Sequence, residues 1–61
     1  MTLRQRAVLW QLMRGRSNRQ IADELGIAEE TVKVHLKALF VEAGVRSRLE
    51  LALWAQRRRR G

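Results

Sequence analysis

Residues 17–43 read SNRQIADELGIAEETVKVHLKALFVEA, and this stretch contains two helical patterns separated by a glycine. Ser17 and Gln20 have the spacing of a capping box, in which side chains at a helix start satisfy free backbone N–H groups. Gly26 supplies the left-handed conformation that commonly ends a helix. Beyond a short turn, apolar side chains recur at helical spacing to the end of the stretch. The stretch therefore predicts a helix-turn-helix, with one helix on each side of residues 26–28.

The same start and stop signals continue on both sides of this stretch. They are a capping box at Thr2 and Gln5, another at Ser47 and Glu50, and glycine stops at Gly15 and Gly44. We expect helices over residues 3–14, 18–25, 29–43 and 48–58. Ala28 holds the cap position of the third helix, where its side chain cannot accept a backbone hydrogen bond. The predicted fold class is all-α: a compact four-helix domain over residues 1–58 that contains the helix-turn-helix, followed by a basic tail at 59–61.

Apolar residues of all four helices and of two turns supply one expected core. Its members are Val8, Leu9, Leu12, Ile21, Ala22, Leu25, Ile27, Val32, Leu36, Leu39, Phe40, Ala43, Val45, Leu49, Ala52 and Leu53. This set is large enough for one compact core and too small for two.

The last helix is apolar on two sides. Its first face, Leu49 with Ala52 and Leu53, is expected in the core. The second face consists of Leu51, Trp54 and Ala55. A chain this small leaves that face without an intramolecular partner, so we expect these three residues to form a symmetric dimer contact.

Composition narrows the classes of function. The chain has 61 residues with 13 Lys and Arg against 6 Asp and Glu, a formal net charge of +7 that favours a polyanionic partner. Four of these cations form the terminal run Arg57 to Arg60. There is no cysteine, one histidine, and no apolar run near the roughly 20 residues that span a membrane. No nucleophile and base are paired. We expect no enzyme, cofactor, metal site or membrane partner.

The outer side of the third helix has side chains suited to DNA. Opposite the core stripe lie Glu30, Lys33, Val34, Lys37, Ala38 and Val41. Lys33 and Lys37 can donate to phosphates and base acceptors, and Val34 can contact a thymine methyl group. The alternative is a solvated lysine face with one exposed valine, which is common on protein surfaces.

Four runs of the sequence resemble the LuxR/FixJ/NarL (GerE-type) DNA-binding domain. They are SNRQIA at 17–22, LGI at 25–27, TVKVHL at 31–36 and GVRSR at 44–48. The resemblance extends from about Thr2 to Gln56. It implies a third helix that enters the major groove of double-stranded DNA, dimers on inverted-repeat promoter sites, and a cytoplasmic, nucleoid-associated regulator. It also implies an N-terminal receiver or ligand-sensing domain, as in response regulators of two-component systems, so we expect either an excised domain or a stand-alone regulator.

Residue by residue, the resemblance implies two groups of DNA contacts. Base-reading positions are matched by Lys33, Val34 and Lys37. Positions near the phosphate backbone are matched by Arg19, Thr31, His35, Arg46 and Ser47. The sequence departs from the family pattern at Val41 and Glu42, where basic residues are usual, and at Gln11, where an aliphatic residue is usual. Trp10 stands where the family usually has a polar residue; it either covers neighbouring apolar surface or meets a missing domain.

Three other functions are compatible with the sequence. A module like region four of a sigma factor shares the helix-turn-helix and basic third helix. A helical protein-interaction module that contacts RNA polymerase or a sensor domain is suggested by Trp10, Leu51 and Trp54. A basic helix lying on a membrane surface is a further alternative, although the core stripes and caps favour a folded domain.

Overall fold

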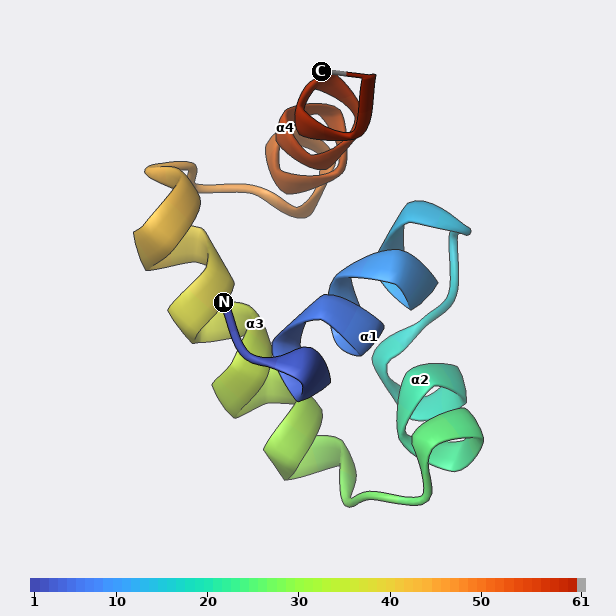
Figure 1. The fold of residues 1–61 in the computed structure, drawn as a ribbon. Helices are drawn as coiled ribbons and strands as arrows, with labels where there is room; N and C mark the ends of the chain where they lie inside the picture. The colour runs from blue at the N-terminus through green and yellow to red at the C-terminus, as the bar shows by residue number, and fades with distance from the viewer. Residues whose placement is uncertain (61) are drawn as a thin grey trace.

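A computed structural model describes the backbone of residues 1–60 and the side chains of residues 1–58 (Figure 1). The helices are α1 (Leu3–Met13), α2 (Asn18–Leu25), α3 (Glu29–Ala43) and α4 (Arg48–Arg60). No strand occurs within this range, so the all-α prediction is confirmed. The helix limits match the predicted ranges to within two residues. The predicted basic tail at 59–61 falls outside the residues whose side chains are described.

Side-chain caps explain where α1 and α2 begin. The Thr2 hydroxyl accepts a hydrogen bond from the Gln5 backbone N–H at 3.0 Å, and Gln5 Oε1 accepts from the Thr2 N–H at 3.0 Å. Ser17 and Gln20 repeat this exchange at 3.2 and 2.9 Å. Both capping boxes are therefore confirmed. Ala28 makes no side-chain cap bond at the start of α3, also as expected.

The third capping box is only half formed. The Glu50 N–H donates to Ser47 Oγ at 3.1 Å, as predicted. Glu50 Oε1, however, accepts from the Arg46 N–H at 3.4 Å rather than from that of Ser47. The carboxylate thus reaches one residue farther back, because Arg46 presents its N–H to the first turn of α4.

Gly26 closes the corner of the helix-turn-helix. Its φ of 67° is left-handed, and the Ile27 N–H reaches back to the Ala22 carbonyl at 3.0 Å. This six-to-one bond, the mark of a Schellman motif, reverses the chain and leads into α3. Gly44 ends α3 in the same way, with a φ of 69° and a Val45 N–H bond to the Phe40 carbonyl.

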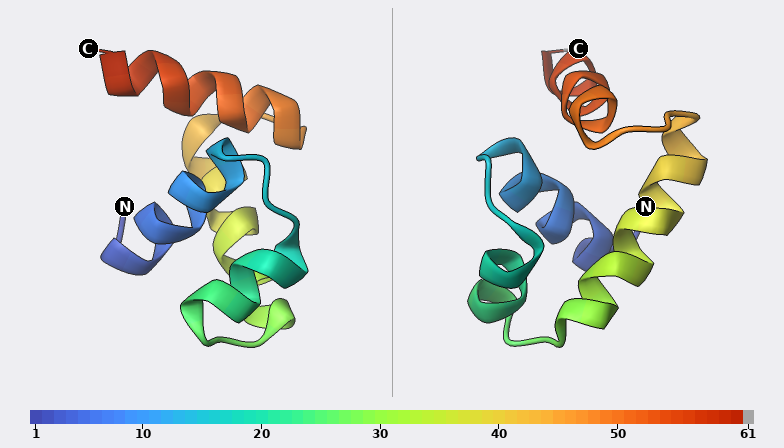
Figure 2. Two further views of the ribbon diagram at one scale, coloured as in Figure 1. Left: turned by 90° about the vertical axis from the view of Figure 1, so that its right-hand side faces the viewer. Right: turned by 180° about the vertical axis from the view of Figure 1, so that it is seen from behind.

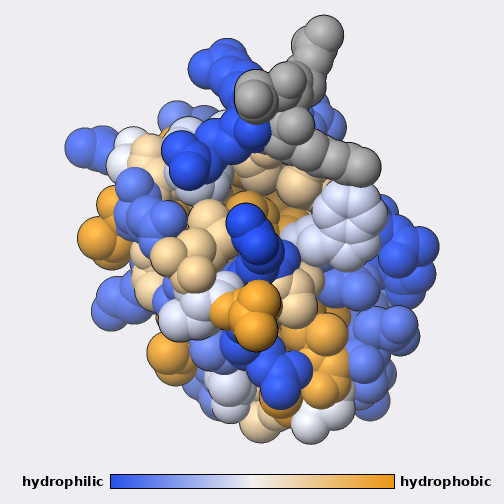
Figure 3. Space-filling view, viewed as in Figure 1, coloured by the Kyte–Doolittle hydropathy of each residue, from blue (hydrophilic) through white to orange (hydrophobic). Residues whose placement is uncertain are grey.

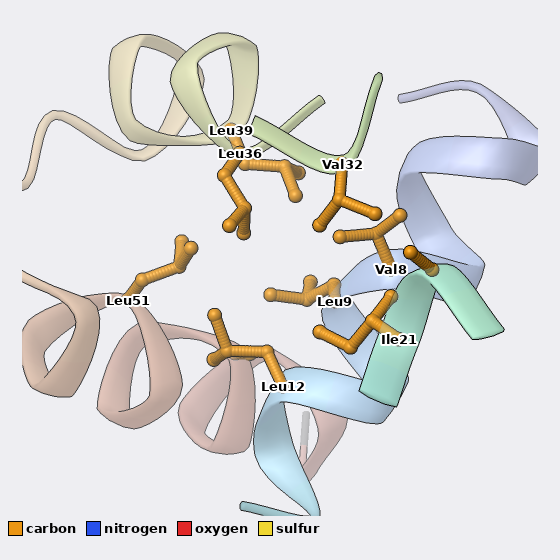
Figure 4. Close-up of a cluster of buried hydrophobic side chains, with 10 residues drawn as sticks. Val8, Leu9, Leu12, Ile21, Val32, Leu36, Leu39 and Leu51 are labelled. Carbon is orange, nitrogen blue, oxygen red and sulfur yellow. The ribbon is translucent and has the colours of Figure 1, made fainter. Parts of the chain in front are cut away.

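One hydrophobic core joins all four helices (Figure 4). α1 packs against each of the other three, and α4 lies across the ends of α1 and α3 (Figure 2). Fully or nearly buried are Val8, Leu9, Leu12, Ile21, Ala22, Val32, Leu36, Leu39, Leu51 and Ala55. Partly buried around them are Met13, Leu25, Ile27, Phe40, Ala43, Val45, Ala52 and Trp54.

The predicted orientation of α4 is wrong. Leu51 is fully buried and points towards Leu36 and Leu39 of α3 (Figure 4), while Leu49 and Leu53 are 70% and 45% exposed. Ala55 is also buried and Trp54 is half-buried, so the three residues expected at a dimer surface belong to the core of the single chain. Both faces of α4 are apolar, and the packing on α1 and α3 decides which one turns inward.

Candidate nucleic-acid interface

α3 presents its polar and small side chains on the side away from the core. Val32, Leu36 and Leu39 are buried on one side of the helix. Thr31, Lys33, Val34, Lys37, Ala38 and Val41 are exposed. The predicted separation into a core face and an outer face is confirmed. Val34, 66% exposed, lies beside the two lysines on this face and offers a methyl-sized apolar contact to a ligand.

The two lysines differ in their partners. Lys33 Nζ lies 3.3 Å from Glu30 Oε1, one helical turn earlier, and both side chains are exposed. Such an exposed pair contributes about 0–1 kcal/mol, so a phosphate or a base acceptor can replace the carboxylate at little cost. Lys37 has no hydrogen-bond or ion-pair partner within the described part of the chain. Its ammonium is therefore directly available to an anion.

The residues matched to phosphate positions lie at helix starts and beside α3. Arg19 is exposed in the first turn of α2, Thr31 in that of α3, and Arg46 just before α4. Ser47 uses its oxygen to cap α4, which leaves the hydroxyl hydrogen free to donate. His35 is half-buried, between the core and the outer face of α3. Helix starts carry free N–H groups and partial positive charge, which suit phosphate oxygens.

Arg48 joins two of these helix starts and was missed by sequence reasoning. Its Nη1 donates to Asn18 Oδ1 at 2.7 Å, and its Nη2 donates to the Arg16 carbonyl at 2.7 Å. The guanidinium thereby ties the first residue of α4 to the first residue of α2 and to the loop before it. The partners lie 30 and 32 residues earlier in the chain, so no local pattern indicates this link.

The last turn of α3 differs from its first half. Val41 and Glu42 are both exposed, and Glu42 Oε1 is 3.8 Å from the Met1 amino nitrogen. An exposed carboxylate repels phosphate, so the cationic part of the outer face ends at Lys37.

Metal-binding clusters and membrane-spanning helices are both absent from the described residues. Those residues contain no cluster of three or more His, Cys, Asp or Glu side chains that could hold a metal ion. None of the helices in this part of the chain combines the length and the apolar character needed to cross a bilayer.

Residues 1–55, which contain all four helix starts and the outer face of α3, match the family described as bacterial regulatory proteins, luxR family. The chain belongs to the LuxR family. It is a helix-turn-helix DNA-binding domain of a bacterial transcriptional regulator, as the four sequence runs predicted.

This LuxR-family chain is similar to several curated bacterial regulators. It is 39% identical over 59 residues to the nitrate/nitrite response regulator protein NarL of Escherichia coli K12, covering 97% of this chain and 27% of that protein. It is 49% identical over 49 residues to NarP of the same strain, covering 80% and 23%. The CsgBAC operon transcriptional regulatory protein of that strain is 42% identical over 55 residues, with 90% and 26% covered. The LuxR-family chain thus spans about a quarter of the length of these curated relatives.

Proposed function

We propose that this LuxR-family domain binds double-stranded DNA sequence-specifically, with α3 in the major groove. The observation that carries the proposal is the outer face of α3, where Lys33, Val34 and Lys37 are exposed together while the opposite side of the helix forms the core. A helix with two donors beside a small apolar group matches the pattern of guanine acceptors and thymine methyl groups in that groove.

Contacts to the phosphate backbone fix the position of the helix in this proposal. Arg19, Thr31, His35, Arg46 and Ser47 are assigned this role. These contacts carry little sequence information, and they make the affinity depend on salt because each one releases a counterion from DNA.

We also propose that the domain acts as a homodimer on an inverted repeat, through a face of α4 that differs from the predicted one. Leu49 and Leu53 lie one turn apart, and both are exposed. Two copies that meet through these leucines bury apolar surface that a single chain leaves in water. Half-sites about one helical turn of DNA apart would fit such a dimer.

The proposal also covers where the domain acts, what controls it and which protein it meets at the promoter. It acts in the bacterial cytoplasm on nucleoid DNA, and a receiver or ligand-sensing domain controls it within a response regulator of a two-component system. RNA polymerase is its partner at the promoter. The similarity to NarL and NarP supports this setting.

Selection from a randomised duplex pool at two salt concentrations tests the DNA proposal. We expect an enriched inverted repeat for the unaltered chain. The double variant Lys33→Ala with Lys37→Ala should bind that repeat at least about tenfold more weakly, since each good base contact contributes about 1–3 kcal/mol of discrimination.

The matched control is Arg57→Ala with Arg58→Ala, which removes the same charge from the far end of α4 and should keep the sequence preference. The opposite outcome is that DNA is retained without any enriched motif and is lost at the higher salt. The chain would then bind only phosphates, nonspecifically, and the roles given to Lys33, Val34 and Lys37 would be refuted.

A further inference from the structure

A second surface lies between α1 and α4, away from the outer face of α3. An open hollow of about 580 Å³ is bounded by these two helices and the last turn of α3. Its walls include Arg6, Trp10 and Met13 from α1, Trp54 and Arg58 from α4, and Glu42 from α3. In the view of Figure 3, hydrophobic residues are exposed among hydrophilic ones. None of the residues assigned to DNA lines the hollow.

The side chains around the hollow are those that protein interfaces favour. Trp, Met and Arg are enriched where proteins meet, and Trp and Arg are enriched among the few residues that carry most of the binding energy. Trp10 is exposed, Trp54 is half-buried, and Met13 provides a flexible apolar wall. The aromatic rings supply contact area with few rotatable bonds, so a partner that covers them loses little side-chain entropy.

Arginines give the hollow a distinct charge. Arg58 lies with its guanidinium carbon 4.8 Å from the centre of the Trp54 ring, which holds the cation at the apolar wall. Arg6 supplies a second cation from α1. Glu42 is the one acid among the described residues that line the hollow, and it stands at the α3 end near the Met1 amino nitrogen. Two cations beside two indole rings match a ligand that combines carboxylates with an apolar group.

We propose that this hollow binds an acidic peptide segment of a partner protein. An aromatic or aliphatic side chain of the segment enters between Trp10 and Trp54, and flanking carboxylates pair with Arg6 and Arg58. Duplex DNA fits less well, because its backbone presents phosphates and sugars while its bases stay stacked inside the helix. The proposal is independent of the DNA interface, so the domain can hold DNA and the segment together.

Tryptophan fluorescence provides a direct test. Trp10 and Trp54 are the only tryptophans, the chain has no tyrosine, and both rings line the hollow. The probe is a synthetic helical peptide with a central Leu-Phe pair flanked by glutamates. We expect a saturable change in emission. Analogues with Gln for Glu, or with Ala for the Leu-Phe pair, should bind at least about tenfold more weakly.

A charge swap locates the binding. Arg6→Glu with Arg58→Glu should lose the acidic peptide and gain an analogue with lysines in place of glutamates, a gain that an unfolded chain would not show. Lys33→Ala with Lys37→Ala should bind the acidic peptide as the unaltered chain does, which separates this proposal from the DNA proposal. Equal binding of the Gln analogue, unchanged binding by the charge-swapped chain, or loss of binding in the lysine variant would each overturn the inference.

Discussion

Gln11, in α1, brings a polar group into the hydrophobic core. The residue is 8% exposed, and its Oε1 has no hydrogen-bond partner among the described residues. A buried acceptor without a partner keeps the cost of leaving water and gains nothing in return. An aliphatic residue, which the resemblance to the LuxR-type domain implies at this position, would leave no buried acceptor unpaired.

Replacement of this glutamine should stabilise the domain. We expect Gln11→Leu, a change of similar volume, to raise the free energy of unfolding by about 1 kcal/mol, because it removes the unpaired oxygen. Urea denaturation followed by circular dichroism measures the change. Glu24→Leu, which puts leucine on the exposed side of α2, should stay within about 0.5 kcal/mol. A less stable Gln11→Leu chain would show that the glutamine has a partner in solution.

Substitutions at Arg46 and Arg48 should have different effects on stability and on DNA affinity. Arg48→Met keeps the apolar stem and loses the bonds to Asn18 and Arg16, so we expect a loss of about 1 kcal/mol in the free energy of unfolding. Arg46→Met removes an exposed guanidinium without a side-chain partner in the described chain. It should leave stability nearly unchanged, weaken DNA binding across all sequences, and lower the salt slope by about one.

Thermal unfolding and DNA titration on the same samples compare the two variants. Equal stability losses in both would contradict the assignment of Arg48 as the structural member of the pair.

The stability of two variants should show which side of α4 is buried. Leu51 is fully buried, so Leu51→Ala leaves a cavity and should cost about 3 kcal/mol of unfolding free energy. Leu53→Ala removes the same atoms from an exposed position and should cost less than about 1 kcal/mol. Chemical denaturation of both variants decides the matter. The reverse order of the two losses would restore the orientation expected from the sequence.

Local signals made the helix limits predictable, and the lack of a local signal explains the error in α4. Capping boxes at Thr2 and Ser17 and the stop at Gly26 act within one turn, so sequence alone determines them. The outer face of α3 follows from its single apolar stripe. α4 has two such stripes, and long-range packing selects between Leu51 and Leu53. The bonds of Arg48 are long-range as well, so they too escape a reading of the sequence.

The exposed leucines of α4 predict how two copies of the chain associate. Leu49→Glu with Leu53→Glu places carboxylates on the proposed dimer face. We expect loss of self-association and an apparent affinity for an inverted repeat at least about tenfold weaker, because the second half-site no longer binds as part of one complex. Sedimentation and DNA titration measure the two effects.

Leu3→Glu is the control, since this leucine is also exposed but lies on α1. It should change neither result. A double variant that still associates and still binds both half-sites together would exclude the α4 contact.

The proposed contact of the outer face of α3 with bases also bears on how readily this domain could acquire a new operator. Lys33, Val34 and Lys37 contribute nothing to the core, and exposed substitutions usually change stability by no more than about 0.5 kcal/mol. A library randomised at these three positions should therefore keep nearly all of its members folded. Differences in sequence preference among those members would then reflect DNA contacts alone, so the scaffold and its specificity can evolve separately.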